Sequence, residues 1–186
     1  MLSKRALTAM SAITVLGMIL AAVTSTAASN APTEPQRPVA ATQTVVVPAA
    51  ADATVRSGWP STNFGSESSL EISYDELRGV VKEAAVLVRF DLSSLPGDAV
   101  IDAAYLRLYL EGASGASPVS VVAKFITSPW HESTVTWNTY LTTEPVGRST
   151  SIDSTLFSYK SWYIPWFVQA WADNPSSNHG VLLRGP

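Results

Sequence analysis

Apolar residues recur at every second position in several short segments of this chain. A period of two places alternate side chains on opposite faces of a sheet, so the pattern predicts β-strands. In the segment 103–110, for example, Leu106 and Leu108 are directed inward, and Tyr105 and Tyr109 are directed outward. In the segment 84–92, Val86 and Val88 share one apolar face. The segments with this pattern are 70–74, 84–92, 103–110, 119–127 and 181–184.

Clusters of glycine, proline, serine and asparagine separate these segments, as at 59–65, 96–98 and 112–115. Short strands joined by such turns favour a β-sandwich or a barrel. The segment 162–173 has helical periodicity instead, and Pro165 suits the first turn of a helix. We therefore expect an all-β fold, an antiparallel β-sandwich with one short helix near the C-terminus.

The N-terminus has the layout of a secretory signal peptide. Lysine and arginine precede an apolar run over 6–23 and a small-residue stretch over 24–31. We expect a signal peptide over residues 1–27, cleaved near Ala27 or Ala28. The alternative is an uncleaved anchor, because the run approaches the roughly 18 residues that can begin to span a bilayer.

The segment 28–44 consists mainly of alanine, proline, threonine and other small or polar residues. It cannot bury enough apolar surface to offset the entropy of ordering its backbone, so we expect a flexible linker. The residues 45–186 are enough for a single β-sandwich domain.

Composition narrows the possible functions. The chain has no cysteine, a net charge of −3 and a charged fraction of 15%. Disulfides and thiolate chemistry are therefore excluded, and the scattered lysines and arginines do not form the basic footprint that nucleic-acid binding needs. Beyond the leader no second apolar run is long enough to cross a membrane, so no membrane partner is expected after signal cleavage.

Motifs of known catalytic centres are missing from the sequence. The two histidines, His131 and His179, lack His-Glu-x-x-His spacing, and 112–116 lacks the Gly-x-Ser-x-Gly order. We interpret both histidines as loop residues. No pair of acidic residues stands out as a glycosidase would require. We expect no enzyme activity and no required cofactor, with a small polysaccharide lyase or hydrolase as the alternative.

The six tryptophans need an explanation, because each ring can bury a large apolar surface. Trp137 and Trp171 lie in apolar-periodic contexts, so we assign them to the core. Trp59 lies in the polar loop 57–61. An exposed ring there can stack on the C–H face of a sugar, so we hypothesise that Trp59 contacts carbohydrate.

The outward face of 103–110 is a second candidate sugar platform. Tyr105, Arg107 and Tyr109 share this face, and we expect Arg89 and Lys124 on other strands to extend it. Two aromatic rings beside a guanidinium suit an acidic sugar, because arginine can hold a carboxylate through two hydrogen bonds. The alternative is an ordinary solvated face that is covered only by long amphipathic side chains.

Two carboxylates have candidate structural roles. Asp91 lies at the end of a predicted strand, and Glu132 lies in the segment 130–138. We expect both to accept hydrogen bonds from loop groups. The alternative is that Asp91 and Glu132 help to hold a structural calcium ion.

Several motifs occur together along the chain and resemble one known family. They are Asp52-Ala53-Thr54-Val55, Thr62-Asn63-Phe64-Gly65, the pair 89–96 and 101–109, Trp130-His131-Glu132-Ser133-Thr134-Val135-Thr136-Trp137-Asn138, and the pair 168–171 and 178–183. This set resembles the DNRLRE domain, also grouped as carbohydrate-binding module family 96. The resemblance covers about Val47 to Gly185 and implies a jelly-roll-like β-sandwich that binds polysaccharide, without assigning individual contact residues.

The resemblance departs from the family at two places. Ile164-Pro165-Trp166 stands where the family has an Asp-Val-Thr-like step, and the family continues into a last strand where this sequence ends at Pro186. The second difference leaves open a C-terminally truncated chain or a sandwich that lacks an edge strand.

The function we predict is that of a secreted, non-catalytic module that binds polysaccharide outside the cell or at its surface. An acidic polysaccharide and other domains of a larger secreted protein are the expected partners. The non-enzymatic alternative is a structural or adhesive spacer module that has no sugar ligand.

Overall fold

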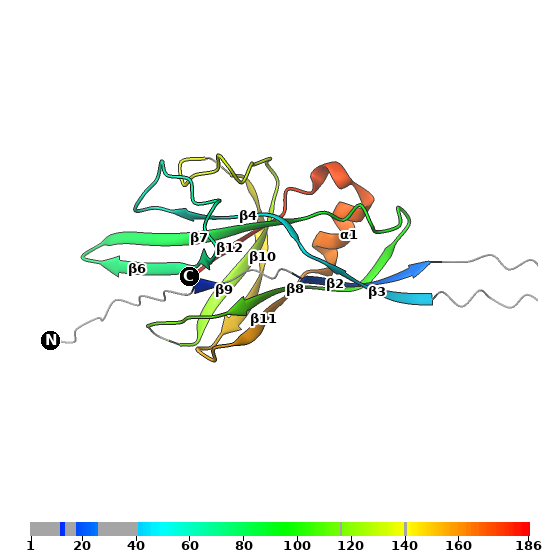
Figure 1. Cartoon of the computed structure of the whole chain (residues 1–186), viewed down its shortest axis with the longest axis horizontal. Helices are drawn as coiled ribbons and strands as arrows, with labels where there is room; N and C mark the ends of the chain where they lie inside the picture. The colour runs from blue at the N-terminus through cyan, green and yellow to red at the C-terminus, as the bar shows by residue number, and fades with distance from the viewer. Residues whose placement is uncertain (1–11, 14–17, 26–40, 116, 140) are drawn as a thin grey trace, which may run out of the picture.

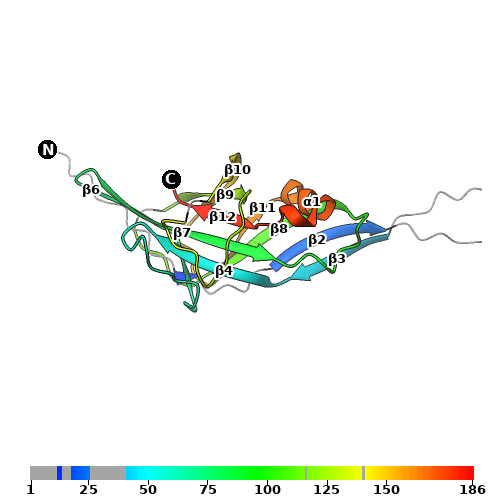
Figure 2. The same ribbon diagram turned by 90° about the horizontal axis from the view of Figure 1, so that it is seen from above.

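Two antiparallel β-sheets are packed face to face, as the alternating pattern predicts (Figure 1 and Figure 2). The computed structural model describes residues 12–13, 18–25, 41–115, 117–139 and 141–186. The strands are β1 (Ala12–Ile13), β2 (Met18–Ser25), β3 (Ala41–Val47), β4 (Ala49–Arg56), β5 (Leu70–Glu71), β6 (Ser73–Leu77), β7 (Val80–Phe90), β8 (Val100–Leu110), β9 (Val119–Ile126), β10 (Thr143–Ile152), β11 (Ser158–Tyr163) and β12 (Val181–Arg184). The helices are α1 (Pro165–Asp173) and the 3-10 turn η1 (Pro175–Ser177).

Each sheet joins strands that are far apart in the sequence. The larger sheet has the order β10-β9-β12-β7-β4, and β6 also pairs with β7. The smaller sheet has the order β11-β8-β2-β3, and β1 pairs only with β5. The antiparallel sandwich with one short helix near the C-terminus is therefore confirmed.

The inner faces of the two sheets form the main core. Val86 and Val88 from β7 are fully buried opposite Leu106 and Leu108 from β8, so the predicted inward sets are confirmed. The helix α1 covers one end of the sandwich, where Trp171 stacks on Phe125 with the ring centroids 5.3 Å apart. The assignment of Trp171 to the core is thus confirmed as well.

A loop covers the outer face of the larger sheet. Trp130 and Val135, from the segment between β9 and β10, pack with Leu87 and Ile126 in a second buried cluster. The Trp130 indole N–H donates a hydrogen bond to the carbonyl of His179 at 2.7 Å. Leu87 alternates away from the main core yet is fully buried, because this loop closes over it.

The strands β10 and β11 were not predicted from the sequence, and β11 corrects one assignment. The sequence places Trp162 at the start of the helix, whereas it lies in β11 and α1 begins at Pro165. Pro165 does stand at the start of the helix, as expected. The strand β10 contains Pro145 and lies at the edge of its sheet, where a missing backbone N–H is tolerated.

Part of the expected leader forms a strand in the smaller sheet. The strand β2 pairs with β8 on one side, where Ala21 is in register with Ala104, and with β3 on the other, where Ala21 is in register with Val45. The strand β3 begins at Ala41, inside the expected linker. A chain cleaved near Ala27 would keep β3 and lose β2. The rest of the expected leader and linker lies outside the described residues, and cleavage remains a prediction.

Among the described residues, neither helix has the length and apolar composition required to cross a bilayer.

Candidate functional site

Four tyrosines gather on the outer face of β8 and β11. The register of the two strands places Tyr109 beside Tyr159 and Tyr105 beside Tyr163. The ring centroids are 5.2 Å apart in the first pair and 5.1 Å apart in the second. Tyr105, Tyr159 and Tyr163 are exposed, and Tyr109 is half-buried. These contacts hold the rings in a row that remains open to solvent.

Arg107 lies between the two tyrosine pairs. It is half-buried beside Ser161 on the neighbouring strand, and its guanidinium carbon is 4.5 Å from the centroid of the Tyr159 ring. A cation over an aromatic face is attracted by the ring quadrupole. The arginine is therefore positioned by the ring, while the other side of its planar donor group can meet a ligand. We call Tyr105, Arg107, Tyr109, Tyr159 and Tyr163 the tyrosine face.

Strand alternation positions the tyrosine face. Leu106 and Leu108 point into the core from β8, which leaves the odd-numbered residues outside. On β11 the buried residue is Trp162, and its indole N–H donates a hydrogen bond to the carbonyl of Val121 in the opposite sheet at 2.9 Å. This link between the sheets fixes the orientation of β11 and so presents Tyr159 and Tyr163 outward.

Sequence reasoning found three of the five residues of this face. It placed Tyr105, Arg107 and Tyr109 together, and the structure does bring them together. It missed Tyr159 and Tyr163, because Trp162 was assigned to the helix and no strand was expected before it. The alternation of Tyr159, Ser161 and Tyr163 around inward Trp162 is the signal that could have revealed them.

Arg89 and Lys124 do not extend the tyrosine face, which corrects the expectation from the sequence. Both lie on the outer face of the larger sheet, on the opposite side of the sandwich. Arg89 lies 5.7 Å from the Trp130 ring centroid, and Lys124 is paired with Leu182 on β12. The period-two pattern shows which side of a strand a residue faces, but it does not show which sheet contains the strand.

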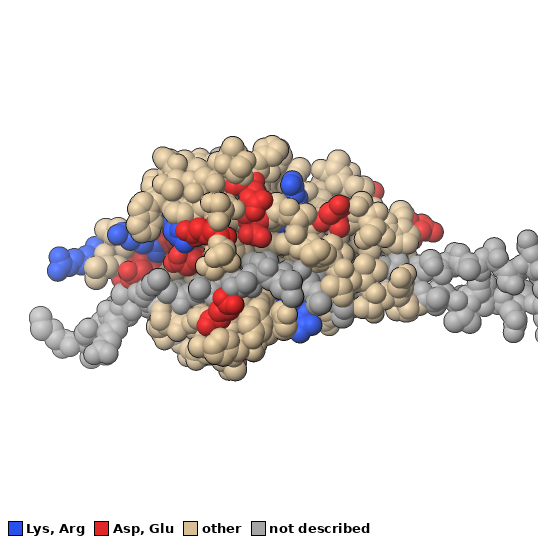
Figure 3. Space-filling model, in the orientation of Figure 1, with Lys and Arg blue, Asp and Glu red and all other residues tan. Residues whose placement is uncertain are grey.

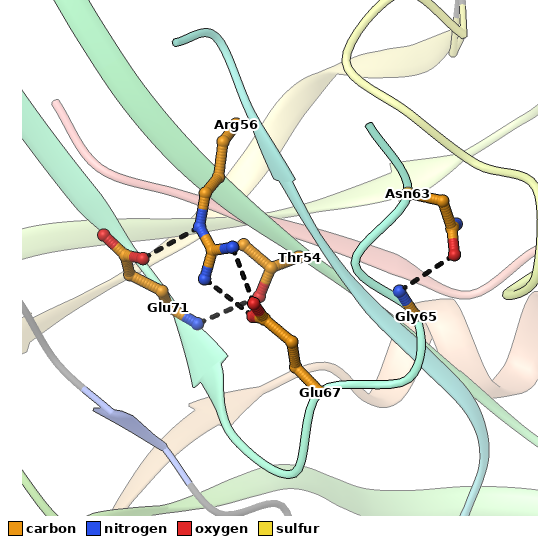
Figure 4. A network of polar contacts seen from close by, with 6 residues as sticks. All are labelled: Thr54, Arg56, Asn63, Gly65, Glu67 and Glu71. Carbon is orange, nitrogen blue, oxygen red and sulfur yellow. Dashed lines mark hydrogen bonds and ion pairs between the residues drawn. The ribbon is translucent and has the colours of Figure 1, made fainter. Parts of the chain in front are cut away.

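Trp59 is exposed, with 63% of its surface accessible, but it belongs to a different surface. It follows β4 of the larger sheet, and its ring meets the Phe64 ring edge-on at 6.5 Å. The Arg56 guanidinium lies 4.1 Å from the Phe64 centroid. Figure 4 shows Arg56 bound to both Glu67 and Glu71, with distances of 2.7 and 3.0 Å in the two ion pairs.

Charges are mixed on the visible side of the molecule. Figure 3 shows lysines and arginines next to aspartates and glutamates on this side, without one continuous basic stripe. Such mixing does not provide the concentrated positive field that a nucleic acid backbone would need.

Asp91 and Glu132 both have hydrogen-bonding roles. Asp91 accepts the backbone N–H of Ser93 at 2.9 Å, and this hydrogen bond holds the pKa of Asp91 below its usual value. Glu132 accepts the backbone N–H of Asp52 at 3.4 Å. Within the described part of the chain, no group of three or more acidic residues or histidines is placed to hold a metal ion. A calcium ion at Asp91 or Glu132 remains a prediction that has not been tested.

Asp52 and Glu132 form a carboxylate pair that the sequence did not reveal, since 80 positions separate them. Burial raises the pKa of Asp52, and the nearby charge of Glu132 raises it further. The folded state therefore binds a proton at Asp52 more tightly than the unfolded state does. The protonated Asp52 carboxyl therefore contributes to the free energy of unfolding. This contribution is fully present below the unfolded pKa and is lost as the pH rises through the folded pKa.

The substitution Asp52→Asn is expected to stabilise the protein at pH 7 by a few tenths of a kcal/mol, since partial solvent exposure screens the repulsion. The gain should disappear as the pH falls below the ordinary aspartate pKa of about 3.9, because the carboxyl is then protonated in both the folded and the unfolded state. Urea unfolding midpoints at several pH values would measure it. Asp98→Asn, in an exposed turn, is the control. A gain that is constant over the whole pH range would contradict the electrostatic explanation.

The fold and the tyrosine face define a class of protein, an antiparallel β-sandwich that keeps exposed aromatic rings on one outer face. Comparison with protein families gives a specific assignment. The model of carbohydrate-binding module family 96 matches residues 43–186, so the chain belongs to this family. The match runs from β3 to the end of the chain and includes both the tyrosine face and Trp59. No curated protein matches the chain.

Proposed function

We propose that this protein is a secreted, non-catalytic module that binds an acidic polysaccharide through the tyrosine face. Membership of a carbohydrate-binding family supports the ligand class. The observation that carries the proposal is the position of Arg107 between two tyrosine pairs, with its guanidinium over Tyr159. The N-terminal leader predicted from the sequence supports secretion.

The arrangement provides the two interactions that a charged sugar chain needs. The tyrosine rings can stack on the C–H faces of successive sugars, while the Arg107 guanidinium donates two parallel hydrogen bonds to a sugar carboxylate. Because each ring already contacts its neighbour, little side-chain entropy is lost on binding. Shallow stacking with few hydrogen bonds corresponds to dissociation constants in about the micromolar to millimolar range.

Polygalacturonate and its fully methyl-esterified form provide a direct test, because esterification removes the charge and keeps the sugar backbone. We expect the purified protein to bind polygalacturonate in calorimetry and affinity electrophoresis, and to bind the ester at least about tenfold more weakly. Arg107→Ala should weaken binding to polygalacturonate by about tenfold or more. Arg107→Lys should restore it only in part, since lysine lacks the planar pair of donors.

Arg78→Ala is the matched control, because Arg78 is exposed in the β6–β7 hairpin of the other sheet. It removes the same charge and should leave binding within about twofold of wild type. Equal losses for Arg78→Ala and Arg107→Ala would refute a localised site. Loss of binding on Trp59→Ala but not on Arg107→Ala would place the site at the Trp59 loop. Release of reducing ends or unsaturated uronates would show an enzyme instead.

Secretion is tested separately by mass spectrometry of the protein recovered from the culture medium. A product that begins near Ala28 would support the leader and would also show that the exported form lacks β2. A product that still contains residues 18–25 would argue against cleavage at this position.

A further inference from the structure

Trp59 is the one exposed tryptophan of this protein. All six tryptophans lie in the described part of the chain, and the other five are buried or half-buried. With 63% of its surface accessible, the Trp59 ring keeps at least one face open to solvent. Tryptophan stabilises a fold chiefly by burying its large ring, so a ring left in water needs another explanation.

The turn that carries this ring is fixed by hydrogen bonds. The N–H of Trp59 donates to the carbonyl of Arg56 at 3.1 Å, and the N–H of Thr62 donates to the carbonyl of Trp59 at 3.0 Å. The loop between β9 and β10 adds a third hydrogen bond, from the N–H of Asn138 to the carbonyl of Pro60 at 2.9 Å. We call residues 59–62 the Trp59 turn. Its backbone is tied to both neighbouring segments.

The same loop holds the segment that follows the Trp59 turn. The side-chain amide of Asn63 donates to the carbonyls of Glu132 and Val135, both at 2.7 Å. Gly65 packs directly on this loop, because a Cβ atom there would lie 2.1 Å from the carbonyl oxygen of Glu132. Figure 4 shows that Asn63 also accepts the N–H of Gly65, at 3.3 Å. Two of the motifs found in the sequence therefore meet directly beneath the exposed ring.

A series of side chains also positions the ring itself. Glu67 and Glu71 bind the Arg56 guanidinium, which lies over the ring of Phe64 (Figure 4). The Phe64 ring in turn meets the ring of Trp59 edge-on. Because these groups are already in place, a ligand that stacks on Trp59 orders few side chains on binding.

The charges at the Trp59 turn favour a neutral ligand. Arg56 is the cation of these contacts, and two carboxylates already bind it. Glu132 adds a further carboxylate beneath the turn. A negatively charged chain is therefore not attracted here, in contrast to the tyrosine face with Arg107. Ser61, Thr62 and Asn138 are exposed, and their hydroxyl and amide groups can pair with the hydroxyls of a sugar.

We infer that the Trp59 turn is a second carbohydrate site, which binds a neutral glycan. A sugar ring stacks through its C–H face on the open indole face, and the exposed hydroxyl and amide groups bond its hydroxyls. Membership of a carbohydrate-binding family supports this ligand class. The turn follows β4 of the larger sheet, whereas the tyrosine face lies on the smaller sheet. One molecule can then hold a neutral chain and an acidic chain together, although the inference does not depend on the proposal for the tyrosine face.

The Trp59 indole signal in a ¹H–¹⁵N NMR spectrum provides the test. It is the signal that is missing from the spectrum of Trp59→Phe. Cellohexaose, maltohexaose, mannohexaose and xylohexaose would each be titrated into the full chain, with hexagalacturonate as the acidic counterpart. At least one neutral oligosaccharide should shift the signal in a saturable manner, with an affinity at least about tenfold higher at this site than that of hexagalacturonate. This affinity should stay within about twofold between about 50 and 500 mM salt, because no charge pair is screened.

Substitutions measured by calorimetry test the contact. Trp59→Ala should weaken binding of the responding oligosaccharide by about tenfold or more, and Trp59→Phe, which keeps a smaller ring, should weaken it less. Phe157→Ala is the matched control, because it removes an aromatic ring with 71% of its surface exposed from the turn before β11. It should bind within about twofold of wild type, as should Arg107→Ala. Exposed residues are changed in each case except the half-buried Arg107, and unfolding midpoints would verify that the variants are folded.

Three results would overturn the inference. The first is the absence of a saturable shift with any of the four neutral oligosaccharides. The second is wild-type affinity in Trp59→Ala, or an equal loss in Phe157→Ala. The third is tighter binding of hexagalacturonate than of the neutral oligosaccharides at the Trp59 signal, which would contradict the neutral ligand. Failure of polygalacturonate to bind the tyrosine face would leave all of these outcomes unchanged.

Discussion

Replacing Trp162 with alanine is expected to lower the free energy of unfolding by about 3–5 kcal/mol. The ring is 1% exposed in the main core, and its indole N–H joins β11 to the carbonyl of Val121 in the opposite sheet. The substitution leaves a cavity between the sheets and an unpaired carbonyl on β9. Urea unfolding followed by circular dichroism would measure the change.

Trp162→Phe separates the two contributions. It keeps an aromatic ring in the core but loses the hydrogen bond, so we expect a smaller loss of about 1–3 kcal/mol. The tyrosine face should also become less ordered in Trp162→Ala, because Tyr159 and Tyr163 depend on the same strand. Unfolding midpoints of Trp162→Ala within experimental error of wild type would contradict the position of this ring in the core.

Gly180→Ala is expected to cost about 2–5 kcal/mol of stability, through backbone strain and a steric clash together. Gly180 precedes β12 and has a φ of +83°, a conformation that side chains other than glycine rarely adopt. A Cβ atom at this position would lie 2.2 Å from the carbonyl oxygen of Val88. The clash is with the backbone of a central strand, so it cannot be relieved by rotating a side chain.

Gly79→Ala is the matched control for Gly180→Ala. Gly79 has nearly the same conformation, with a φ of +80°, but a Cβ atom there would meet no atom within 4 Å. We expect Gly79→Ala to cost only about 1 kcal/mol, the strain of the conformation itself. The difference between the two variants in urea unfolding then measures the clash. Equal losses would show that crowding at Gly180 is unimportant.

The two outer faces of the sandwich differ in what covers them. The loop that carries Trp130 and Val135 covers much of the outer face of the larger sheet. The outer face formed by β8 and β11 keeps Tyr105, Tyr159 and Tyr163 exposed. An exposed aromatic surface usually marks an interaction site. This difference in exposure supports the proposal that polysaccharide binds on the smaller sheet.

The local pattern of the sequence was enough to predict β7 and β8 and their inward residues. Strand alternation in β7 and β8 predicted the burial of Val86, Val88, Leu106 and Leu108, and the structure confirms all four. The same alternation placed Tyr105, Arg107 and Tyr109 on one face. These predictions depend on neighbouring residues of a single strand, for which the period of two is a property of the backbone itself.

Strands that lack apolar alternation could not be predicted from the sequence, and β10 is an example. The strand β10 contains Pro145, Gly147 and several serines and threonines, so its sequence does not differ from that of a loop. Gly147 is nevertheless required there, because a Cβ atom would lie 2.4 Å from a methyl group of Val122 on β9. Only the neighbouring strand explains this residue.

Which strands lie next to each other depended on contacts that are distant in the sequence. The pairing of β8 with β11 brought Tyr159 and Tyr163 beside Tyr109 and Tyr105, whereas Arg89 and Lys124 fell on the opposite face of the sandwich. Alternation along a strand follows from local backbone geometry, so the sequence alone was sufficient for it. Sheet membership follows from the packing of the whole core, so only the tertiary structure could show which side chains share one surface.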